Sequence, residues 1–559
     1  MNPAFRELRE LLPTDVNPPE TRFPLDGKRI KVWVDALPRA NQQAVLRDVE
    51  EAIASINAQR CDAGQRFTAM EALRPVVLES VQLLERSLNG ATYPLTDQQS
   101  AAARLTHRLH ARFAQGYLQV AVDHCAPAGN VPFMRGGQVA TALERSMFHA
   151  ARRLLIGYTL YMSPSDGLWR ELHVLYGFAV SSKLAGKSVD DASVPGATSP
   201  GHAYAHAVLL AISNPYRFSQ REQEQLWTLC ADLARFCDVH DDEGDGRFPL
   251  AQHGDHVPNQ PMDADDEEAG MRWFDLSKVA SAIQAGLGDA RDGDIMLRPV
   301  GGKSLVAPAD LLRRLRGGWV PAAARGHQRL QAGHRLDTVL GLSGLHYQLA
   351  DRQSFDGFMQ RLSGARLGGG SERASWAHGG TDSGSTQVAE ATVLDQSLGG
   401  YRLRWTAEKR IRARVGELIG LSVSGGGDVH DWMVGVVRWL RYDPDGGMYA
   451  GVELLARRAQ PLGVRVLGGD GVSRPAQRGI RLRPVRGEQE GDWTLLVPSL
   501  VDARARLEIA HNGVMDDFDE PEPAVLCLQP RVVIENAGDY VLLAANRIGV
   551  DVLESDARA

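Results

Sequence analysis

The spacing of apolar residues changes along the chain, from a period near 3.6 residues to a period of two. Between about residues 40 and 240, apolar side chains recur every three or four positions, as at Val45, Val49, Ile53 and Ile56, which is typical of amphipathic helices. The pattern predicts helices over about 41–57, 67–88, 96–118, 138–162, 166–183, 202–213 and 219–238. Short Gly, Pro and Ser breaks separate them, so we expect antiparallel neighbours in a helical bundle or an array of helical hairpins.

Local signals refine three of these helices. Asn41 precedes the first apolar repeat and is a suitable N-cap, and Thr96 opens another helix with Asp97 behind it, where a negative charge favours the positive helix end. Pro75 lies inside the 67–88 pattern, so it either marks the first turn of a new helix or kinks one helix. We expect a helical domain over 39–240, preceded by an N-terminal extension over 1–38.

The composition changes after Cys237. The stretches VHDDEGDGRFP and DADDEEAG are acidic, polar and rich in turn formers, which indicates an irregular exit from the helical domain. Short helices are predicted around 275–285 and 308–316, the second with proline at its start. Residues 241–316 are therefore predicted to form an irregular, acidic linker with short helices.

From about Arg335 onward the apolar period is two, which predicts strands. The first group of strands is RLDTVLGLSGLHYQL, TQVAEATVLDQS, GYRLRWTA, GELIGLSV, WMVGVVRWLRYDPDGGMYAGVELL and LGVRVL. YDPDGGMY between two strands indicates a hairpin. A second group of strands begins near 478 and ends with VVIENAGDYVLLAANRI. Residues 363–387 are rich in Gly and Ser, so we interpret them as an insertion within the first β region.

Composition and charge narrow the class of protein. The 559 residues carry 62 basic and 69 acidic side chains, a net charge of −7, which argues against a general DNA- or RNA-binding protein. Five scattered cysteines without a CxxC pair are typical of a reducing compartment. The N-terminus lacks the apolar segment of a secretory signal, and the longest strongly apolar stretch, 154–162, is too short to span a bilayer. We therefore expect a cytoplasmic protein without a membrane span.

Two separated motifs carry the most informative chemistry. RGHQR places Arg325 and Arg329 four residues apart, and DQSLGG places Asp395, Ser397 and Gly400 in the order D-x-S-x-x-G, with Gly399 beside Gly400. The first motif leads into one predicted strand and the second leads into GYRLRW.

This pair resembles the two-part ligand motif of PilZ domains, which are receptors for cyclic di-GMP. The resemblance covers about 320–466, roughly a quarter of the chain, and implies an α+β multidomain protein. A helical domain would precede a PilZ-like antiparallel β-barrel over 317–466, and a small β domain over 467–559 would follow. The resemblance implies a cyclic di-GMP site made of Arg325, Arg329, Asp395, Ser397, Gly399 and Gly400.

The chemistry of these residue types suits that ligand, a dianion with two guanine faces. A guanidinium group binds guanine O6 and N7, or phosphate, through two parallel hydrogen bonds and also stacks on bases. Asp395 offers an acceptor for the guanine N–H edge, Ser397 a donor for phosphate, and Gly400 or Gly399 allows close backbone approach. The alternative is that both arginines are solvated charges and that Asp395 and Ser397 only start a turn.

The chain departs from the PilZ pattern in one respect. Arg329 and Asp395 are 66 positions apart, longer than one strand and a turn, and the Gly/Ser-rich insertion accounts for most of the excess. A barrel tolerates this because loop-closure entropy grows slowly with loop length. The alternative arginines are Arg361, Arg366 and Arg373, whose spacing fits less well. Arg410, Arg412 and Arg414 are predicted to face solvent on one strand.

A metal-dependent enzyme is a third possibility. Residues 238–268 contain three histidines and several aspartates, namely His240, His253, His256, Asp241, Asp242 and Asp255. Their spacing matches no known metal site, and a solvated acidic loop explains them better. No G-x-S-x-G, H-E-x-x-H or nucleophilic cysteine signature is present, so we expect neither an enzyme, a metal nor a cofactor.

The sequence thus favours a bacterial, non-enzymatic effector that binds cyclic di-GMP. Binding would order the arginine-bearing segment 317–334 and change how the barrel meets the helical domain, which would present a surface to an unknown protein partner. The family resemblance points to motility, type IV pili or surface attachment as the output. The alternative is a PilZ-like scaffold or adaptor that does not bind nucleotide.

Overall fold

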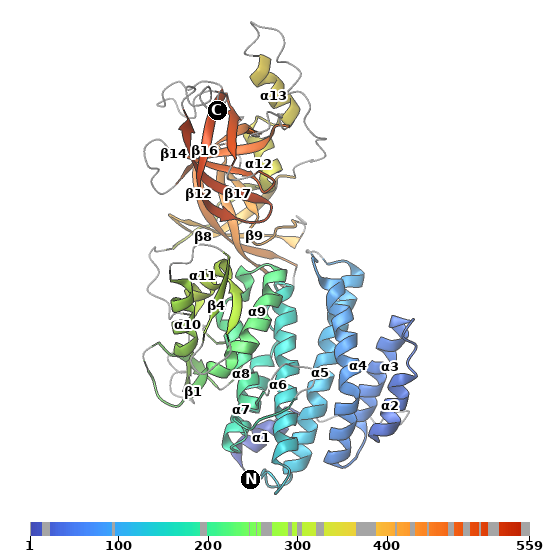
Figure 1. The fold of residues 1–559 in the computed structure, drawn as a ribbon. Helices are drawn as coiled ribbons and strands as arrows, with labels where there is room; N and C mark the ends of the chain where they lie inside the picture. The colour runs from blue at the N-terminus through green and yellow to red at the C-terminus, as the bar shows by residue number, and fades with distance from the viewer. Residues whose placement is uncertain are drawn as a thin grey trace, which may run out of the picture. The chain divides into compact units, whose positions relative to one another are not determined.

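The chain forms two compact units, Met1–Ala324 and Arg325–Ala559. The computed structural model describes residues 2–13, 23–91, 95–190, 198–244, 246–252, 254–255, 257–258, 271–288, 293–298, 304–319, 329–364, 387–407, 411–424, 431–443, 446–467, 475–484, 492–501, 505–512 and 525–548. Each unit is described separately (Figure 1). The chain is therefore an α+β protein, with its long helices in the first unit and a large antiparallel sheet in the second.

Long helices make up most of the first unit and stand side by side in Figure 1. They are α1 (Pro3–Glu10), α2 (Gly27–Asp35), α3 (Gln42–Ala58), α4 (Ala63–Leu88), α5 (Asp97–Cys125), α6 (Gly136–Thr159), α7 (Leu168–Ser181), α8 (Pro200–Ile212) and α9 (Gln220–Leu233). Each predicted helix appears, and α1 and α2 lie in the segment expected to be an N-terminal extension. Phe5 and Leu8 of α1 are buried in the helical core, so hydrophobic burial holds this segment to the bundle.

The predicted caps of the helical unit are present. The Asn41 side chain accepts a hydrogen bond from the Ala44 amide at 3.1 Å. Thr96 and Gln99 form a reciprocal capping box at the start of α5. Pro75 lies inside α4, which continues as one helix of 26 residues. Pro75 therefore lies inside one helix and does not mark the first turn of a new one.

The segment expected to be an irregular linker contains regular structure. Its strands β1 (Asp238–His240), β3 (Met271–Asp275) and β2 (Phe248–Ala251) form an antiparallel sheet in that order, and β4 (Asp294–Leu297) pairs with β5 (Leu305–Pro308). The two predicted helices are α10 (Ser277–Leu287) and α11 (Ala309–Gly318). Buried apolar residues of these elements join the helical core.

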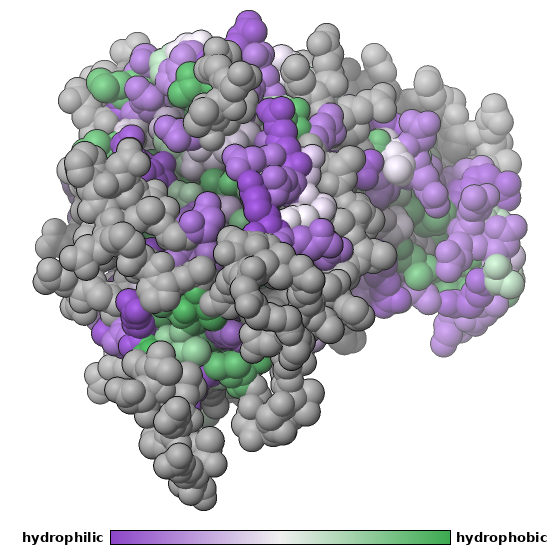
Figure 2. Space-filling view, turned by 90° about the horizontal axis from the view of Figure 1, so that it is seen from above, coloured by the Kyte–Doolittle hydropathy of each residue, from purple (hydrophilic) through white to green (hydrophobic). Residues whose placement is uncertain are grey.

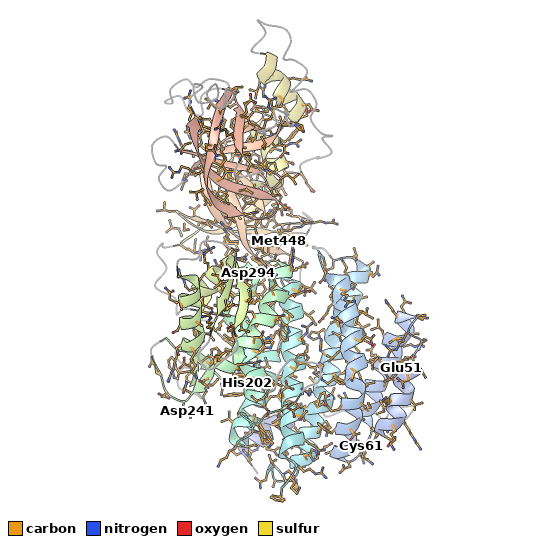
Figure 3. All side chains as sticks on the ribbon, viewed as in Figure 1. Glu51, Cys61, His202, Asp241, Asp294 and Met448 are labelled. Carbon is orange, nitrogen blue, oxygen red and sulfur yellow. The ribbon has the colours of Figure 1, made fainter. Side chains whose placement is uncertain are left out.

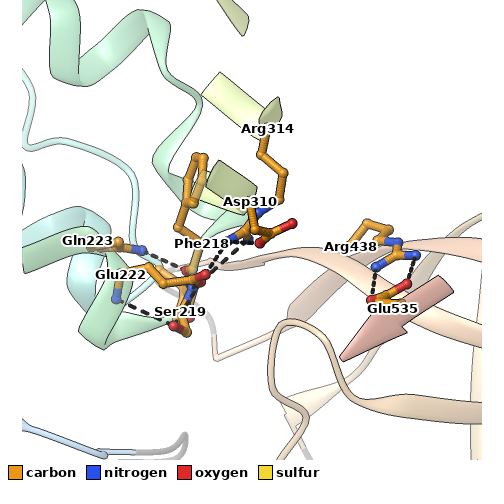
Figure 4. A network of polar contacts seen from close by, with 9 residues as sticks. Phe218, Ser219, Glu222, Gln223, Asp310, Arg314, Arg438 and Glu535 are labelled. Atoms are coloured by element: carbon orange, nitrogen blue, oxygen red, sulfur yellow. Dashed lines mark hydrogen bonds and ion pairs between the residues drawn. The ribbon is translucent and has the colours of Figure 1, made fainter. Parts of the chain in front are cut away.

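One polar network attaches α11 to the start of α9. Ser219 and Glu222 form a capping box, and the Glu222 carboxylate also binds Arg314 of α11 (Figure 4). The Arg314 guanidinium lies 4.9 Å from the centre of the Phe218 ring. Ion pairing and a cation–π contact therefore act together on this arginine.

The second unit is built from antiparallel strands and two helices. The strands are β6 (Leu330–Gln331), β7 (Arg335–Leu340), β8 (Ala389–Ser397), β9 (Gly400–Trp405), β10 (Leu418–Val423), β11 (Met433–Tyr442), β12 (Met448–Leu467), β13 (Gln477–Pro484), β14 (Asp492–Pro498), β15 (Arg506–Ala510), β16 (Val525–Asn536) and β17 (Tyr540–Ile548). The helices are α12 (Gly341–Leu349) and α13 (Phe355–Gly364).

Strand pairing closes two rings that share β12, which begins at Met448 (labelled in Figure 3). The first ring runs β7–β8–β9–β12–β11–β10 and returns to β7, and the second runs β12–β13–β14–β17–β16–β15 and returns to β12. Residues 448–456 of β12 pair within the first ring, and residues 456–467 pair within the second. The two strand groups predicted from the sequence are thus joined by one strand of 20 residues.

The strand prediction was wrong for GLSGLHYQL. Only Arg335–Leu340 is a strand, and α12 begins at Gly341. Apolar side chains of α12 pack against a core cluster drawn from both rings, and His346 of α12 lies 3.1 Å from the Leu462 carbonyl oxygen. The segment forms a helix because its apolar residues can then reach both rings, which a strand in either ring would prevent.

Hydrophilic side chains cover much of the described surface seen in Figure 2. Among the helices that the structure describes, none combines the length and the apolar character needed to cross a membrane. This finding is in line with the short apolar stretches of the sequence.

Glu417, just before β10, provides a test of this fold. Burial raises the pKa of its carboxyl group from 4.5 to about 7, although the Arg414 amide donates a hydrogen bond to it at 2.9 Å. The folded state therefore holds a proton that the unfolded state has lost, and stability falls as pH rises from about 4.5 to about 7.

We predict that Glu417→Gln raises the free energy of unfolding at about pH 8 by roughly 1 kcal/mol and changes it little at about pH 4. The glutamine keeps the acceptor but carries no charge to desolvate. Urea unfolding followed by tryptophan fluorescence measures the difference. An equal change at both pH values would contradict the assigned cause.

Candidate functional site

The two sequence motifs meet at the start of the second unit. Leu330 and Gln331 form β6 and pair with Gln396 and Asp395 of β8. The pairing continues where the Ala332 amide donates to the Leu394 carbonyl oxygen at 3.0 Å. The chain leaving RGHQR thus lies against the strand that carries D-x-S-x-x-G. Arg329 belongs to the described residues, and Arg325 lies outside them.

A β-bulge in β8 determines where Asp395 is placed. Val393 pairs with Leu403, and the register then shifts so that Asp395 pairs with Arg402. Val393 and Leu403 are fully buried on the inner face of the first ring. Without the bulge, Asp395 would share the face of Val393, because side chains alternate along a strand. The extra residue places the carboxylate beside Arg402 on the outer face.

Asp395 is the centre of an ion cluster. Its Oδ1 atom binds the Arg329 guanidinium, and its Oδ2 atom lies 3.7 Å from Nη1 of Arg402. The Asp395 side chain is 12% exposed, whereas those of Arg329 and Arg402 are 44% and 40% exposed. The carboxylate therefore anchors two arginines that keep hydrogen-bond donors directed toward solvent.

The remaining motif residues form the turn between β8 and β9. Ser397 pairs with Gly400, and the two-residue connection is Leu398–Gly399, in which Leu398 is largely exposed. The Leu454 amide of β12 donates to the Gly399 carbonyl oxygen at 2.9 Å. The turn is thus fixed to β12 and lies on the ring that carries Asp395.

Gly400 is required by packing within the protein. A Cβ atom on Gly400 would overlap the Val452 carbonyl oxygen of β12, whereas a Cβ atom on Gly399 would meet nothing within 4 Å. The expectation that Gly400 admits a ligand therefore has a second explanation, namely close approach of β9 to β12. Gly399 has the open surroundings that an approaching ligand needs.

Sequence reasoning missed two arginines of this face and misplaced others. Arg402 and Arg404 alternate with Leu403 in β9, a pattern visible in GYRLRW. Arg412 and Arg414 were predicted on a strand, but residues 411–414 precede β10 without strand structure. Arg361 lies on α13, 3.7 Å from Asp351. The alternatives Arg366, Arg373 and Arg410 lie outside the described residues.

The proposed metal-binding loop has other contacts in the structure. His240 lies 3.6 Å from Asp275, and the Asp255 carboxylate accepts hydrogen bonds from the Gly167, Trp169 and Arg170 amides at the start of α7. Asp241, labelled in Figure 3, follows β1. His253 and His256 lie outside the described residues. Within the described part of the chain, no three His, Cys, Asp or Glu side chains form a metal site.

A cavity of about 410 Å³ lies between α4, α6 and α9 in the first unit. Its wall includes Glu85 and Arg152, which bind each other, and Trp227, whose ring centre is 5.0 Å from the Arg152 guanidinium. Glu85 and Arg152 thus already have partners within the protein. The outer face around Asp395 remains the better candidate.

Comparison with protein families identifies the class of protein. A model described as the N-terminal domain of the cyclic-di-GMP receptor FimW matches residues 28–243, and a model of its middle PilZ domain matches residues 261–378 and 368–461. The two PilZ segments meet within the Gly/Ser-rich stretch. The matches cover more than half of the chain, which therefore belongs to the FimW family of PilZ-domain proteins.

A curated relative agrees with this assignment. The cyclic-di-GMP receptor FimW of Pseudomonas aeruginosa is 26% identical over 488 residues, and the alignment covers 79% of each chain. No solved structure matches the chain.

We predict that Gly400→Ala lowers the free energy of unfolding by about 2 kcal/mol or more, because the new methyl group collides with the β12 backbone. Gly399→Ala is the matched control and should change it by less than about 0.5 kcal/mol. Thermal unfolding followed by circular dichroism measures both. Equal losses in the two variants would contradict the packing role of Gly400.

Proposed function

We propose that this protein is an effector that binds cyclic di-GMP on the outer face of the first ring, and that this ring is a PilZ-like barrel. The observation that carries the proposal is the contact of Arg329 with Asp395, which unites two motifs 66 positions apart. The resemblance to PilZ domains predicts that the two motifs lie together. If Arg329 and Asp395 were solvated charges without a shared site, this ion pair would not be expected.

The geometry suggests how the ligand is held. Asp395 fixes the Arg329 guanidinium, so less side-chain entropy is lost when that group binds guanine or phosphate. We propose that Arg325 and Arg329 clamp one guanine and that Asp395 also accepts from its N–H edge. Ser397 would donate to a phosphate oxygen, and the open surroundings of Gly399, next to Gly400, would allow the ligand to approach.

The comparisons support this ligand. The matching family is named for a cyclic-di-GMP receptor, and so is the curated relative. Both resemble this chain over the helical unit as well as the PilZ region. We infer that the protein acts as a receptor and not as a catalyst, without a metal or cofactor.

The position of the motif suggests how binding is transmitted. Arg325 is the first residue of the second unit, so a ligand that binds Arg325 and Arg329 acts on the chain connecting the two units. We propose that this changes how the units meet and which surface the helical unit presents to a protein partner in the cytoplasm. A ligand shifts such an equilibrium only by its different affinities for the two arrangements. Motility, type IV pili or surface attachment are the proposed outputs.

The second candidate function is a scaffold or adaptor whose ring no longer binds nucleotide. The internal ion pairs of Asp395 favour it, because a carboxylate that already binds two arginines stabilises the fold without a ligand. Direct titration separates the two functions.

We predict that the full chain binds cyclic di-GMP and that Arg329→Ala weakens binding by about 10- to 100-fold. Hydrogen bonds between charged groups contribute roughly 1.5–3 kcal/mol, which corresponds to that range. Isothermal titration calorimetry measures the affinities, with circular dichroism to verify folding.

Arg361→Ala is the matched control, since Arg361 lies on α13 in the same unit and belongs to the alternative arginine set. It should leave the affinity unchanged. Binding that survives Arg329→Ala but is lost in Arg361→Ala would show that the site has been assigned to the wrong arginines. Absence of binding in the unmodified chain would favour the scaffold.

A further inference from the structure

The arginine-bearing face continues beyond the two motifs, across β9, β12 and β11. Arg404 pairs with Tyr449 of β12, and Tyr449 pairs with Arg441 of β11. Directly opposed residues of antiparallel strands lie on the same face. Arg402 and Arg404 are two positions apart in β9, so they also share a face. A row of arginines therefore leads away from Asp395 across three strands.

These arginines gather around one aromatic ring. The guanidinium groups of Arg404, Arg441 and Arg402 lie 5.5, 5.8 and 5.9 Å from the centre of the Tyr449 ring. Cation–π attraction offsets part of the repulsion between these like charges. Tyr449 thus acts as a support that keeps positive charges close together before any ligand binds.

Two carboxylates lie beside arginines of this face. Asp395 lies 3.7 Å from Arg402, and Asp443 lies 3.7 Å from Arg441. In addition, the Arg402 Nε atom is buried without a hydrogen-bond partner in the described structure, which is costly unless an acceptor arrives.

An aromatic side chain extends the same face. Gly451 pairs with both Arg402 and Trp439. A Cβ atom on Gly451 would overlap the Trp439 indole, so the glycine leaves room for the ring over β12, at the position that pairs with Arg402. Trp439 is half-buried, and purines stack on aromatic faces and on guanidinium planes.

We propose that Arg402, Arg404 and Arg441, supported by Tyr449, bind the half of the nucleotide that the two motifs do not hold. This inference rests on the proposed function, because it assigns further residues to the same site. Cyclic di-GMP carries two phosphates, and guanidinium groups held close together suit such a dianion. Arg404 and Arg441 bind phosphate through paired N–H donors, and Tyr449 positions them.

Titration of the full chain with cyclic di-GMP tests the proposal. Arg404→Gln and Arg441→Gln should each weaken binding about 10-fold, and Arg441→Lys should weaken it almost as much, because lysine keeps the charge but lacks the planar fork. Tyr449→Phe keeps the ring and should bind normally, whereas Tyr449→Leu should not. Arg361→Gln is the control, and circular dichroism verifies folding of each variant.

The outcomes separate this inference from the function on which it rests. If the unmodified chain binds and Arg329→Ala abolishes binding, but Arg404→Gln and Arg441→Gln bind normally, the inference is wrong and the proposed function stands. If Arg441→Lys binds normally, a positive charge at this position is sufficient, and the proposed binding of phosphate through paired N–H donors of Arg441 is wrong. If the unmodified chain does not bind, the proposed function fails and the inference fails with it.

Discussion

The pairing of β6 with β8 is the constraint on which the site depends. It aligns Leu330 and Gln331 with Gln396 and Asp395, and so brings Arg329 to a carboxylate 66 residues further along the chain. A single ladder of two residue pairs would not specify this meeting by itself. The ion pair helps to determine which residue lies beside Asp395, because the Asp395 carboxylate is mostly buried and needs a cationic partner.

The shared strand β12 gives the site a firm support. The first half of β12 carries Tyr449 and Gly451 and belongs to the ring with the motifs, while the second half closes the other ring. Arg438 of β11 also binds Glu535 of β16 through two hydrogen bonds of 2.7 and 2.8 Å (Figure 4). Its Nε atom donates to Glu453 of β12 as well. Burial lowers the pKa of Arg438, but these two carboxylates outweigh that effect and raise it. The C-terminal strands therefore brace the ring that bears the site.

The sequence predicted the period of each region and the residues of the motifs, but not the features that depend on tertiary packing. The segment after Leu340 carries Leu342, Leu345 and Leu349. Their steps of three and four residues are those of a helix, but the segment directly follows a strand pattern and was included in that strand, and contact with both rings stabilises the helix. Pro461 lies within β12 and pairs with Ile480. A proline in a strand pattern usually marks an end, which is why one strand was predicted as two.

The site itself was only partly predictable. Arg329 and Asp395 were identified from motif order, and their contact agrees with that hypothesis. The bulge that places Asp395 beside Arg402 leaves one mark in the residue types, because regular alternation from Val393 would place the Asp395 carboxylate in the core. The position of the bulge itself could be read only from the structure. The R-L-R alternation in β9 did carry a signal for Arg402 and Arg404, but only the register with Tyr449 shows that they share one face.

Hydrogen–deuterium exchange of the full chain, with and without cyclic di-GMP, tests the central claim most directly. The account predicts that amides of residues 329–334 and 393–402 are protected without ligand, since Ala332 donates to Leu394, and become more protected when the nucleotide is added. Amides of α13 should not change. Fast exchange in both segments, unaltered by the nucleotide, would show that the two motifs do not form one site.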